Sequence, residues 1–214
     1  MNIVKNLVDK SKYSIKCPYE MEPTRIVVHN TANDASAKSE VTYMISNNNE
    51  VSFHYAVDDV EAIQGIPEDR NAWHAGDGGS GKGNREGIAI EICYSKSGGN
   101  KFDKAEQNAA GLIADILKRY GWGIANVTKH QDYSGKYCPH RTLDLGWERF
   151  LGMVESKLSN KNKTFDNTPD AYAKEAVEWA IKNGILKGTE EGDYKLHSNV
   201  TRQDALVFLY RALK

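Results

Sequence analysis

Short runs of β-branched residues, separated by helical stripes, constrain the fold of this chain more than any other feature. RIVVHN (25–30) and GIAIEI (87–92) are rich in Ile and Val and have the length of buried strands. VSFHYAV (51–57) predicts a third strand. Strands interleaved with helices indicate an α/β domain, here a central β-sheet covered by helices.

Three amphipathic patterns predict the helices of this domain, because their apolar residues recur on one helical face. The first pattern ends at Asn47-Asn48-Asn49, and the second is followed by Gly121, where a left-handed C-terminal cap is usual. The apolar positions of the three patterns are Ala37, Val41, Met44 and Ile45; Ala109, Leu112, Ile113, Ile116, Leu117 and Tyr120; and Trp147, Phe150, Leu151, Val154 and Leu158.

A polar stretch divides the chain into two parts. SNKNKT (159–164) has no apolar anchor, so we predict a first domain over 1–158, a linker over 159–164 with the boundary near 162, and a small helical domain over 165–214. In the small domain one helix should start at Thr168-Pro169 and close at Gly184. A second should begin at Thr201, with Asp204 in the capping-box position, and bury three leucines, Leu206, Leu209 and Leu213. Two helices alone bury little apolar surface, so this domain is expected to pack against a partner surface.

Composition excludes several classes of protein. The 214 residues are 40% hydrophobic and 27% charged, which is typical of a globular chain. No apolar run approaches the roughly 20 residues of a membrane span, so we expect no membrane partner. The N-terminal residues scatter charges where a signal peptide needs an apolar core of roughly 7 to 15 residues, which predicts a chain made in the cytoplasm without a signal peptide.

Residues 161–214 hold nine Lys and Arg against eight Asp and Glu, and the rest of the chain holds 19 Lys and Arg against 21 Asp and Glu. Neither part is charged like a nucleic-acid-binding protein.

Two histidines and a cysteine have the chemistry of a metal site. His29 ends a predicted strand, His130 lies in VTKHQD, and Cys138 follows it by eight residues. Two imidazoles and a thiolate suit Zn²⁺ and leave its fourth position open for water. Without a metal, His29 would be a hydrogen-bonded histidine at the end of a strand, His130 a surface histidine and Cys138 a small buried thiol. Cys17 and Cys93 are interpreted as buried thiols, because an odd count with wide spacing does not make a disulfide framework.

Glu91 and Lys136 are candidates for proton transfer and for charge stabilisation. Alternation in IAIEIC places Ala89, Glu91 and Cys93 on one face of the strand. A carboxylate there is costly to bury without a compensating charge or a role in proton transfer, although a partly exposed edge or an ion pair with Arg85 would also account for it. Lys136 stands two residues before Cys138 and would point the same way in an extended segment; most lysines are simply solvated.

Five motifs in order give the chain a family resemblance. IVVHNTAND, VSFHYAVDD, AIQGIPEDRNAWHAGDG, NREGIAIEICYSKSGG and TKHQDYSGKYCPHR resemble the amidase-2 family of N-acetylmuramoyl-L-alanine amidases, in the form found in phage and prophage endolysins of Gram-positive hosts. The resemblance covers residues 1 to about 158. It implies a fold similar to animal peptidoglycan recognition proteins, with a central mixed sheet flanked by helices and a zinc cleft on one face.

The resemblance implies roles for individual residues. His29, His130 and Cys138 would be the zinc ligands, Glu91 the acid/base carboxylate and Lys136 the oxyanion partner. Four residues match positions that line the family's substrate cleft: Asn30, Thr31, Trp73 and His74. His54 is expected to be structural or cleft-lining rather than a ligand.

The second domain is similar to one S-layer homology repeat. FDNTPDAYAKEAVEWAIKNGILKGT and VTRQDALVFLYRAL carry the match, and in that family the turn at Thr201-Arg202 contacts a secondary cell-wall polymer. Such repeats usually act in threes, and this chain has one. Self-association or a packing role therefore stands beside wall binding as an interpretation.

The implied function is zinc-dependent hydrolysis of the amide between N-acetylmuramic acid and L-alanine, leading to cell-wall lysis after release through holin pores or cell lysis. No organic cofactor is expected. One alternative is a recognition module that binds muramyl peptide without cleaving it, although such relatives lack the cysteine ligand. The other is a cytosolic amidase that recycles soluble muropeptides.

Overall fold

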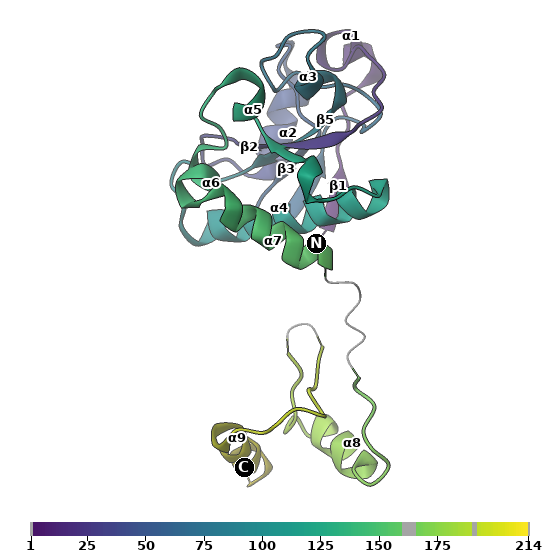
Figure 1. Ribbon diagram of the computed structural model, residues 1–214, viewed down its shortest axis with the longest axis vertical. Helices are drawn as coiled ribbons and strands as arrows, with labels where there is room; N and C mark the ends of the chain where they lie inside the picture. Colours follow the sequence, from purple (N-terminus) through teal and green to yellow (C-terminus); the bar gives the residue numbers. More distant parts are fainter. Residues whose placement is uncertain (1, 160–165, 190–191, 214) are drawn as a thin grey trace. The chain divides into compact units, whose positions relative to one another are not determined.

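The structure is a computed structural model that describes residues 2–159, 166–189 and 192–213 (Figure 1). The chain forms two compact units, Met1–Asn160 and Lys161–Lys214. The linker that we predict over 159–164 lies outside the described residues, except for Ser159. Among the described helices, none is both long enough and apolar enough to cross a membrane.

The larger unit alternates strands with helices, as the sequence predicts. Its strands are β1 (Asn2–Lys5), β2 (Arg25–Asn30), β3 (Tyr55–Val57), β4 (Glu61–Gln64), β5 (Gly87–Ile92) and β6 (Val127–Lys129). Its α-helices are α1 (Tyr13–Lys16), α2 (Ala37–Ser46), α3 (Lys82–Glu86), α4 (Gly99–Tyr120), α5 (Gln131–Ser134), α6 (His140–Leu145) and α7 (Trp147–Ser159), with short 3₁₀ turns at Lys10–Lys12 and Ile124–Asn126.

Within the described residues the strands form one mixed sheet in the order β1-β4-β3-β5-β2-β6. The β3–β4 pair is antiparallel, and the other neighbouring pairs are parallel. In the centre, β2 and β5 run side by side with His29 paired to Glu91. β6 lies on the other side of β2, with Lys129 opposite Val28. The parallel strands β2, β5 and β6 therefore end at the same edge of the sheet.

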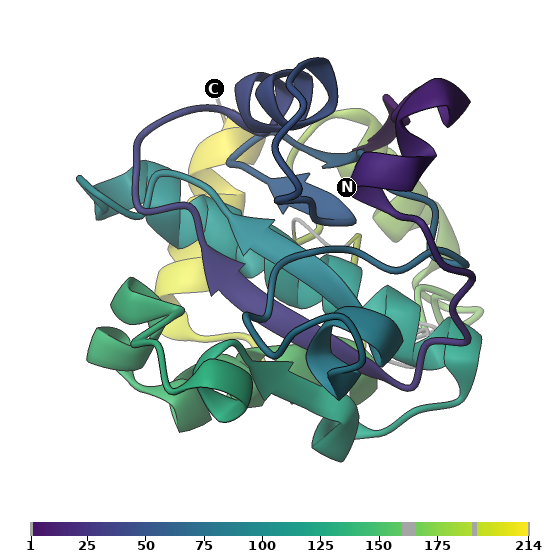
Figure 2. The ribbon, with the colours of Figure 1, turned by 90° about the horizontal axis from the view of Figure 1, so that it is seen from above.

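The two faces of the sheet bury different helices. On one face, alternate residues of β2 and β5 such as Ile26 and Ile90 pack with α4 and α7. On the other face, Ala89 and Cys93 pack with α2. Figures 1 and 2 show α2 on one side of the sheet and α4 with α7 on the other. Because strand side chains alternate, Glu91 lies on the α2 face between Ala89 and Cys93, as predicted. The three predicted helices are confirmed, and Gly121 has the left-handed conformation (φ 69°) of a C-terminal cap.

The predicted strand 51–57 is wrong in its first half, since β3 covers only Tyr55–Val57. The cause is His54, whose ring Nδ1 accepts the Ala89 N–H at 2.9 Å. That N–H is therefore not available to a backbone carbonyl of the expected strand. Ser52 pairs instead with the loop 71–73, because its N–H donates to the Trp73 carbonyl at 3.0 Å.

The smaller unit contains α8 (Lys174–Lys182) and α9 (Arg202–Leu213). α8 starts later than the predicted Thr168-Pro169, because residues 171–173 form a turn first. The capping box of α9 is confirmed, with the Thr201 hydroxyl donating to Asp204 Oδ2 at 2.6 Å and accepting the Asp204 N–H at 3.1 Å.

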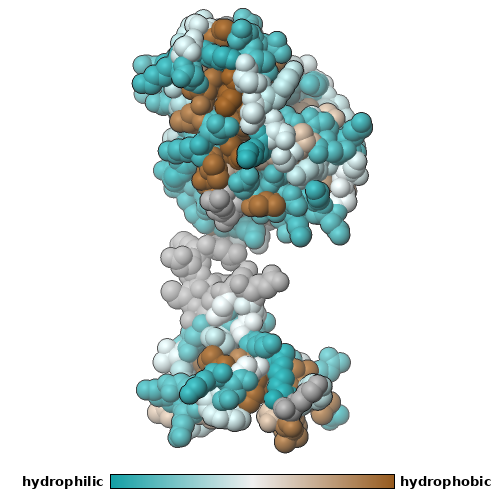
Figure 3. Space-filling model, turned by 180° about the vertical axis from the view of Figure 1, so that it is seen from behind, coloured by the Kyte–Doolittle hydropathy of each residue, from teal (hydrophilic) through white to brown (hydrophobic). Residues whose placement is uncertain are grey.

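The predicted burial of the α9 leucines is wrong. Leu206, Leu209 and Leu213 are 66%, 58% and 86% exposed. Among the described residues of this unit only Ile185 is a buried hydrophobic residue, because two helices cannot enclose a core. Figure 3 shows the resulting apolar side chains at the surface of this unit.

Candidate metal centre

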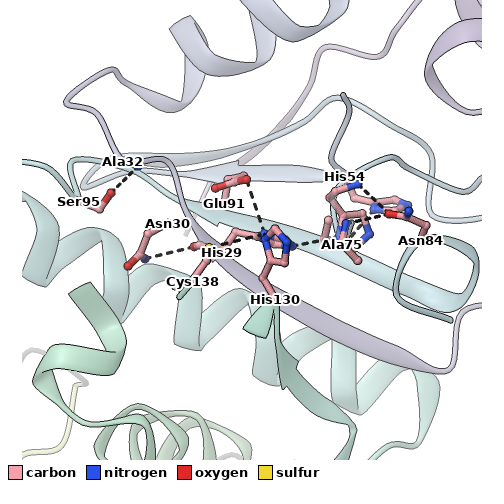
Figure 4. A network of polar contacts seen from close by, with 12 residues as sticks. His29, Asn30, Ala32, His54, Ala75, Asn84, Glu91, Ser95, His130 and Cys138 are labelled. Atoms are coloured by element: carbon pink, nitrogen blue, oxygen red, sulfur yellow. Dashed lines mark hydrogen bonds and ion pairs between the residues drawn. The ribbon is translucent and has the colours of Figure 1, made fainter. Parts of the chain in front are cut away.

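The sheet topology brings three separate segments of the chain to one point. His29 and Glu91 are register partners near the ends of the parallel strands β2 and β5. His130 directly follows β6, and its N–H donates to the Val28 carbonyl at 3.2 Å. Cys138 is held against the same turn, because its carbonyl accepts the Gln131 N–H at 3.0 Å. Figure 4 shows His29, His130, Cys138 and Glu91 gathered around one point at this edge of the sheet.

The three candidate ligands are buried and close together. Their ligand atoms lie within 4.8 Å of one another. His29 Nδ1 is 3.0 Å from His130 Nδ1 and 3.9 Å from Cys138 Sγ. A tetrahedral zinc ion with bonds of about 2.0–2.1 Å to nitrogen and about 2.3 Å to sulfur separates two nitrogens by roughly 3.3 Å and nitrogen from sulfur by roughly 3.6 Å. The donor set is therefore compatible with a metal site of this size.

Protonation also suits a metal. Burial lowers the pKa of His29 well below its usual value, and the neighbouring His74, His130 and Lys136 lower it further. Burial also lowers the pKa of His130. Both imidazoles are thus neutral, which is the form that ligates metals. Burial raises the pKa of the Cys138 thiol to about 11, so a metal must displace its proton to bind.

Glu91 is a partly buried carboxyl group beside the ligands, with its side chain 18% exposed. Its Oε1 lies 3.9 Å from His29 Nδ1, and its Oε2 is buried without a hydrogen-bond partner among the described residues. Burial raises the pKa of Glu91 to about 8; Glu40 raises it further and Lys136 opposes the shift. Arg85 makes no ion pair with it, so the alternative of a structural Glu91–Arg85 pair does not hold among the described residues.

These residues surround a cavity of about 860 Å³. Lys136 is exposed and lines this cavity together with Glu91 and Cys138. The four predicted substrate-contacting residues, Asn30, Thr31, Trp73 and His74, also line it. The Thr31 hydroxyl is buried and has no hydrogen-bond partner among the described residues. Asn30 has a structural task as well, because its Oδ1 accepts the N–H of Arg141 at 2.9 Å and of Thr142 at 3.2 Å.

His74 lies behind a candidate ligand. Its Nδ1 is 3.0 Å from His29 Nε2, and the two rings meet edge to face at 86°. Asn84 fixes this segment, since its side-chain oxygen accepts the N–H groups of His74 and Ala75 at 2.8 Å each. His54, by contrast, is fully buried between the Ala89 N–H and the Arg70 carbonyl, which makes it structural as expected.

Two features of the site have no clear signal in the sequence. Asn84 lies in a motif of the resemblance, but nothing in its neighbours indicates that it fixes the backbone at His74. Glu50 also lines the cavity, in a loop whose Asn-rich sequence predicts only the end of a helix. The Asn84 contacts join loop segments nine or ten residues apart, and the loop that carries Glu50 is held from more than 30 residues away.

Comparison with known proteins identifies the family. Residues 19–141 match the N-acetylmuramoyl-L-alanine amidase family, and residues 163–206 match the S-layer homology domain. The chain is 45% identical to the N-acetylmuramoyl-L-alanine amidase CwlA of Bacillus subtilis (strain 168) over 100% of its own length and 79% of the relative's. It is 51% identical to the amidase XlyB of the same organism over 85% of this chain and 57% of that one.

A solved structure supports the same assignment. The structure of PlyL is 59% identical, with a TM-score of 0.72, over 73% of this chain and 99% of that chain. The predicted resemblance and the mixed α/β fold are thereby confirmed. With a family match over more than half its length and a full-length relative at 45% identity, the chain belongs to the N-acetylmuramoyl-L-alanine amidase family.

Proposed function

We propose that this amidase holds a zinc ion on His29, His130 and Cys138 and hydrolyses the amide bond between N-acetylmuramic acid and L-alanine in peptidoglycan. The observation that supports this best is the meeting of three ligand atoms, within 4.8 Å of one another, beside the partly buried carboxyl group of Glu91 in an 860 Å³ cavity. Two imidazoles and a thiolate leave one position of a tetrahedral zinc ion open, as in catalytic zinc sites.

Bound at these ligands, zinc supplies Lewis acidity that polarises the scissile carbonyl and activates a water molecule. Glu91 accepts the proton of the attacking water. The same carboxyl group then donates that proton to the nitrogen of the departing L-alanine as the C–N bond breaks. Two features of Glu91 suit this proton transfer. Its Oε1 lies 3.9 Å from His29 Nδ1, and its Oε2 has no hydrogen-bond partner among the described residues.

Lys136 stabilises the negative charge that develops on the carbonyl oxygen. Its ammonium group is close enough to lower the pKa of both His29 and His130, so it acts electrostatically on the site. A fixed positive charge near a developing oxyanion stabilises the transition state more than the substrate.

His74 orients His29 for metal binding. With His29 Nδ1 facing His130 and Cys138, the proton of the His29 ring lies on Nε2 and is donated to His74 Nδ1 over 3.0 Å. Such a partner fixes the tautomer and the rotation of a metal-binding imidazole. His74 therefore orients the metal-binding His29 in addition to lining the cavity.

We expect His74→Leu to weaken zinc binding by about 10- to 100-fold, the range typical for loss of an outer-shell partner. His74→Asn should recover part of this loss, because the amide oxygen can accept the His29 N–H. Competition with a chromogenic zinc chelator measures both variants. Equal zinc affinities in the leucine variant and the parent protein would show that His74 does not orient His29.

Product analysis tests the reaction itself. Mass spectrometry of digested purified walls should find new free amines on L-alanine without new reducing sugar ends. Binding of muramyl peptides without any product would favour the non-catalytic recognition module. Cleavage confined to soluble muropeptides would favour the recycling amidase over a lytic enzyme.

The S-layer homology repeat is proposed to bind a secondary cell-wall polymer through Arg202. Arg202 is exposed at the first turn of α9, whereas the Thr201 hydroxyl is already engaged with Asp204 in the capping box. Self-association is the second candidate role, because α9 exposes Leu206, Leu209 and Leu213. Leucines in such number on one short helix are more typical of a surface that becomes covered.

A chain ending at Asn160 should fold, hold zinc and cleave soluble muropeptides at close to the full-length rate, since residues 1–160 form a compact unit that contains every residue assigned to the reaction. Its activity on intact walls should fall. Sedimentation of both forms separates the two roles of the repeat: a full-length oligomer beside a truncated monomer indicates self-association. Equal lysis of host walls by both forms would contradict wall targeting.

A further inference from the structure

One wall of the cavity is formed by the loop 47–52, which joins α2 to the segment before β3. Glu50 and Val51 of this loop line the cavity and are exposed, and Phe53 and Trp73 continue the lining. Apart from Glu50 and Ser52, this wall is formed by apolar and aromatic side chains. Among the residues that the structure describes, no hydrogen bond or ion pair engages the Glu50 side chain.

A buried lysine fixes the shape of this loop. Lys16 is 0% exposed, and its ammonium group donates to the Asn47 side-chain oxygen at 2.9 Å, to the Val51 carbonyl at 3.1 Å and to the Asn49 carbonyl. All three N–H groups of the ammonium are thus used. No carboxylate pairs with Lys16 among the described residues, so its positive charge is stabilised by the loop's own oxygen atoms.

The contacts of Lys16 hold the backbone on both sides of Glu50. The carbonyls before and after Glu50, those of Asn49 and Val51, both turn inward to Lys16. The loop is tied down further by the Ser52 hydroxyl, which donates to the Lys16 carbonyl at 2.6 Å. The backbone around Glu50 is therefore already ordered before a ligand binds, which lowers the ordering cost of binding to that of the Glu50 side chain.

Glu50 is the one ionisable residue of the described cavity lining that has no role in the proposed hydrolysis. The ionisable lining residues other than the three imidazoles and Cys138 are Glu50, Glu91 and Lys136. Glu91 and Lys136 are used in the proposed hydrolysis. A carboxylate beside Val51, Phe53 and Trp73 complements an aliphatic chain that ends in a cation.

We propose that Glu50 binds the side-chain ammonium group of the diamino acid in the peptide stem of the substrate, an inference that rests on the amidase function proposed above. The stem begins at the L-alanine released by the reaction, and its diamino acid carries an aliphatic side chain with a terminal amine. That amine is cationic when free and neutral once acylated in a cross-link. The enzyme should therefore prefer stems that are not cross-linked through this amine.

A matched pair of substrates tests the contact. The pair is a muramoyl tripeptide with lysine in the third position and the same compound with its ε-amine acetylated. The native enzyme should show a kcat/KM about two- to fivefold higher for the free amine, as expected for one exposed charged contact worth up to about 1 kcal/mol. In Glu50→Gln this ratio should fall toward one, and high salt should reduce it in the native enzyme, because exposed charges are screened.

Two further variants separate recognition from general damage. Glu155→Gln removes an exposed carboxylate on α7, away from the cavity lining, and should keep the native ratio. Lys16→Met should lower the ratio by releasing the loop; if this variant does not fold, Glu50→Gln alone decides. A ratio near one in the native enzyme, or a ratio unchanged in Glu50→Gln, overturns the proposal while leaving the amidase function intact. Failure to cleave either compound would instead count against the proposed reaction.

Discussion

Glu91→Gln should lower turnover by about 10²- to 10⁴-fold, the range that a positioned general acid/base contributes. The amide has nearly the same shape as the carboxyl group but cannot carry the proton from water to the leaving nitrogen. Zinc content should be unchanged, because Glu91 is not one of the three candidate ligands. Turnover of a soluble muropeptide and metal analysis of the same sample measure both quantities.

The fold should also survive this substitution. Burial raises the pKa of Glu91 to about 8, so in the metal-free protein the carboxyl group is mostly neutral at pH 7, and a neutral amide replaces it at little electrostatic cost. A bound cation would favour the ionised form instead. Thermal unfolding of the metal-free proteins should therefore differ little between Glu91→Gln and the parent chain.

A neighbouring carboxyl group provides the control. Glu40 of α2 is half-buried, does not line the cavity, and accepts a hydrogen bond from Asn33. Glu40→Gln should cost far less turnover than Glu91→Gln. Near-normal turnover in Glu91→Gln would make Glu91 structural, and another base near the ligands would have to be sought.

The sequence predicts the centre of this domain well because its signals there are local. The runs 25–30 and 87–92 are β2 and β5 with the predicted bounds, and alternation correctly places Glu91 with Ala89 and Cys93. The parallel pairing that brings His29 beside Glu91 is a long-range property, and no local pattern in either strand indicates it.

The parts that the sequence did not predict depend on contacts between distant segments. The strand at 51–54 is missing because the His54 ring takes the Ala89 N–H, a competition that no local pattern reveals. β1, β4 and β6 are three or four residues long and too short to show a period. The leucines of α9 follow a helical stripe but have no facing surface within the unit, because a stripe predicts which residues could be buried and not what would cover them.

Cys138→Ser should abolish stable zinc binding, whereas Cys17→Ser and Cys93→Ser should keep the metal. Cys138 Sγ faces His29 Nδ1 at 3.9 Å within the cavity, and a serine hydroxyl is a poor zinc ligand. Cys17 and Cys93 are 0% exposed in the core on the α2 face and are not among the ligands that meet at the site. Zinc per chain after dialysis against a chelator measures the difference.

The free energy of unfolding should fall more in Cys17→Ser and Cys93→Ser than in Cys138→Ser, which is the reverse of the expected order of zinc loss. The assignment of Cys138 as the ligand can therefore be tested by two measurements. A hydroxyl in place of the Cys17 or Cys93 thiol is buried among apolar side chains and should reduce the free energy of unfolding by about 1–3 kcal/mol. In Cys138→Ser the metal-free protein should lose less, because this side chain borders the cavity, where water can reach a hydroxyl. Zinc affinity of the native chain should also fall as the pH is lowered, because binding must remove the Cys138 proton, whose pKa is raised to about 11. Equal zinc loss in all three serine variants would show that the thiol has been assigned wrongly, whatever their stabilities.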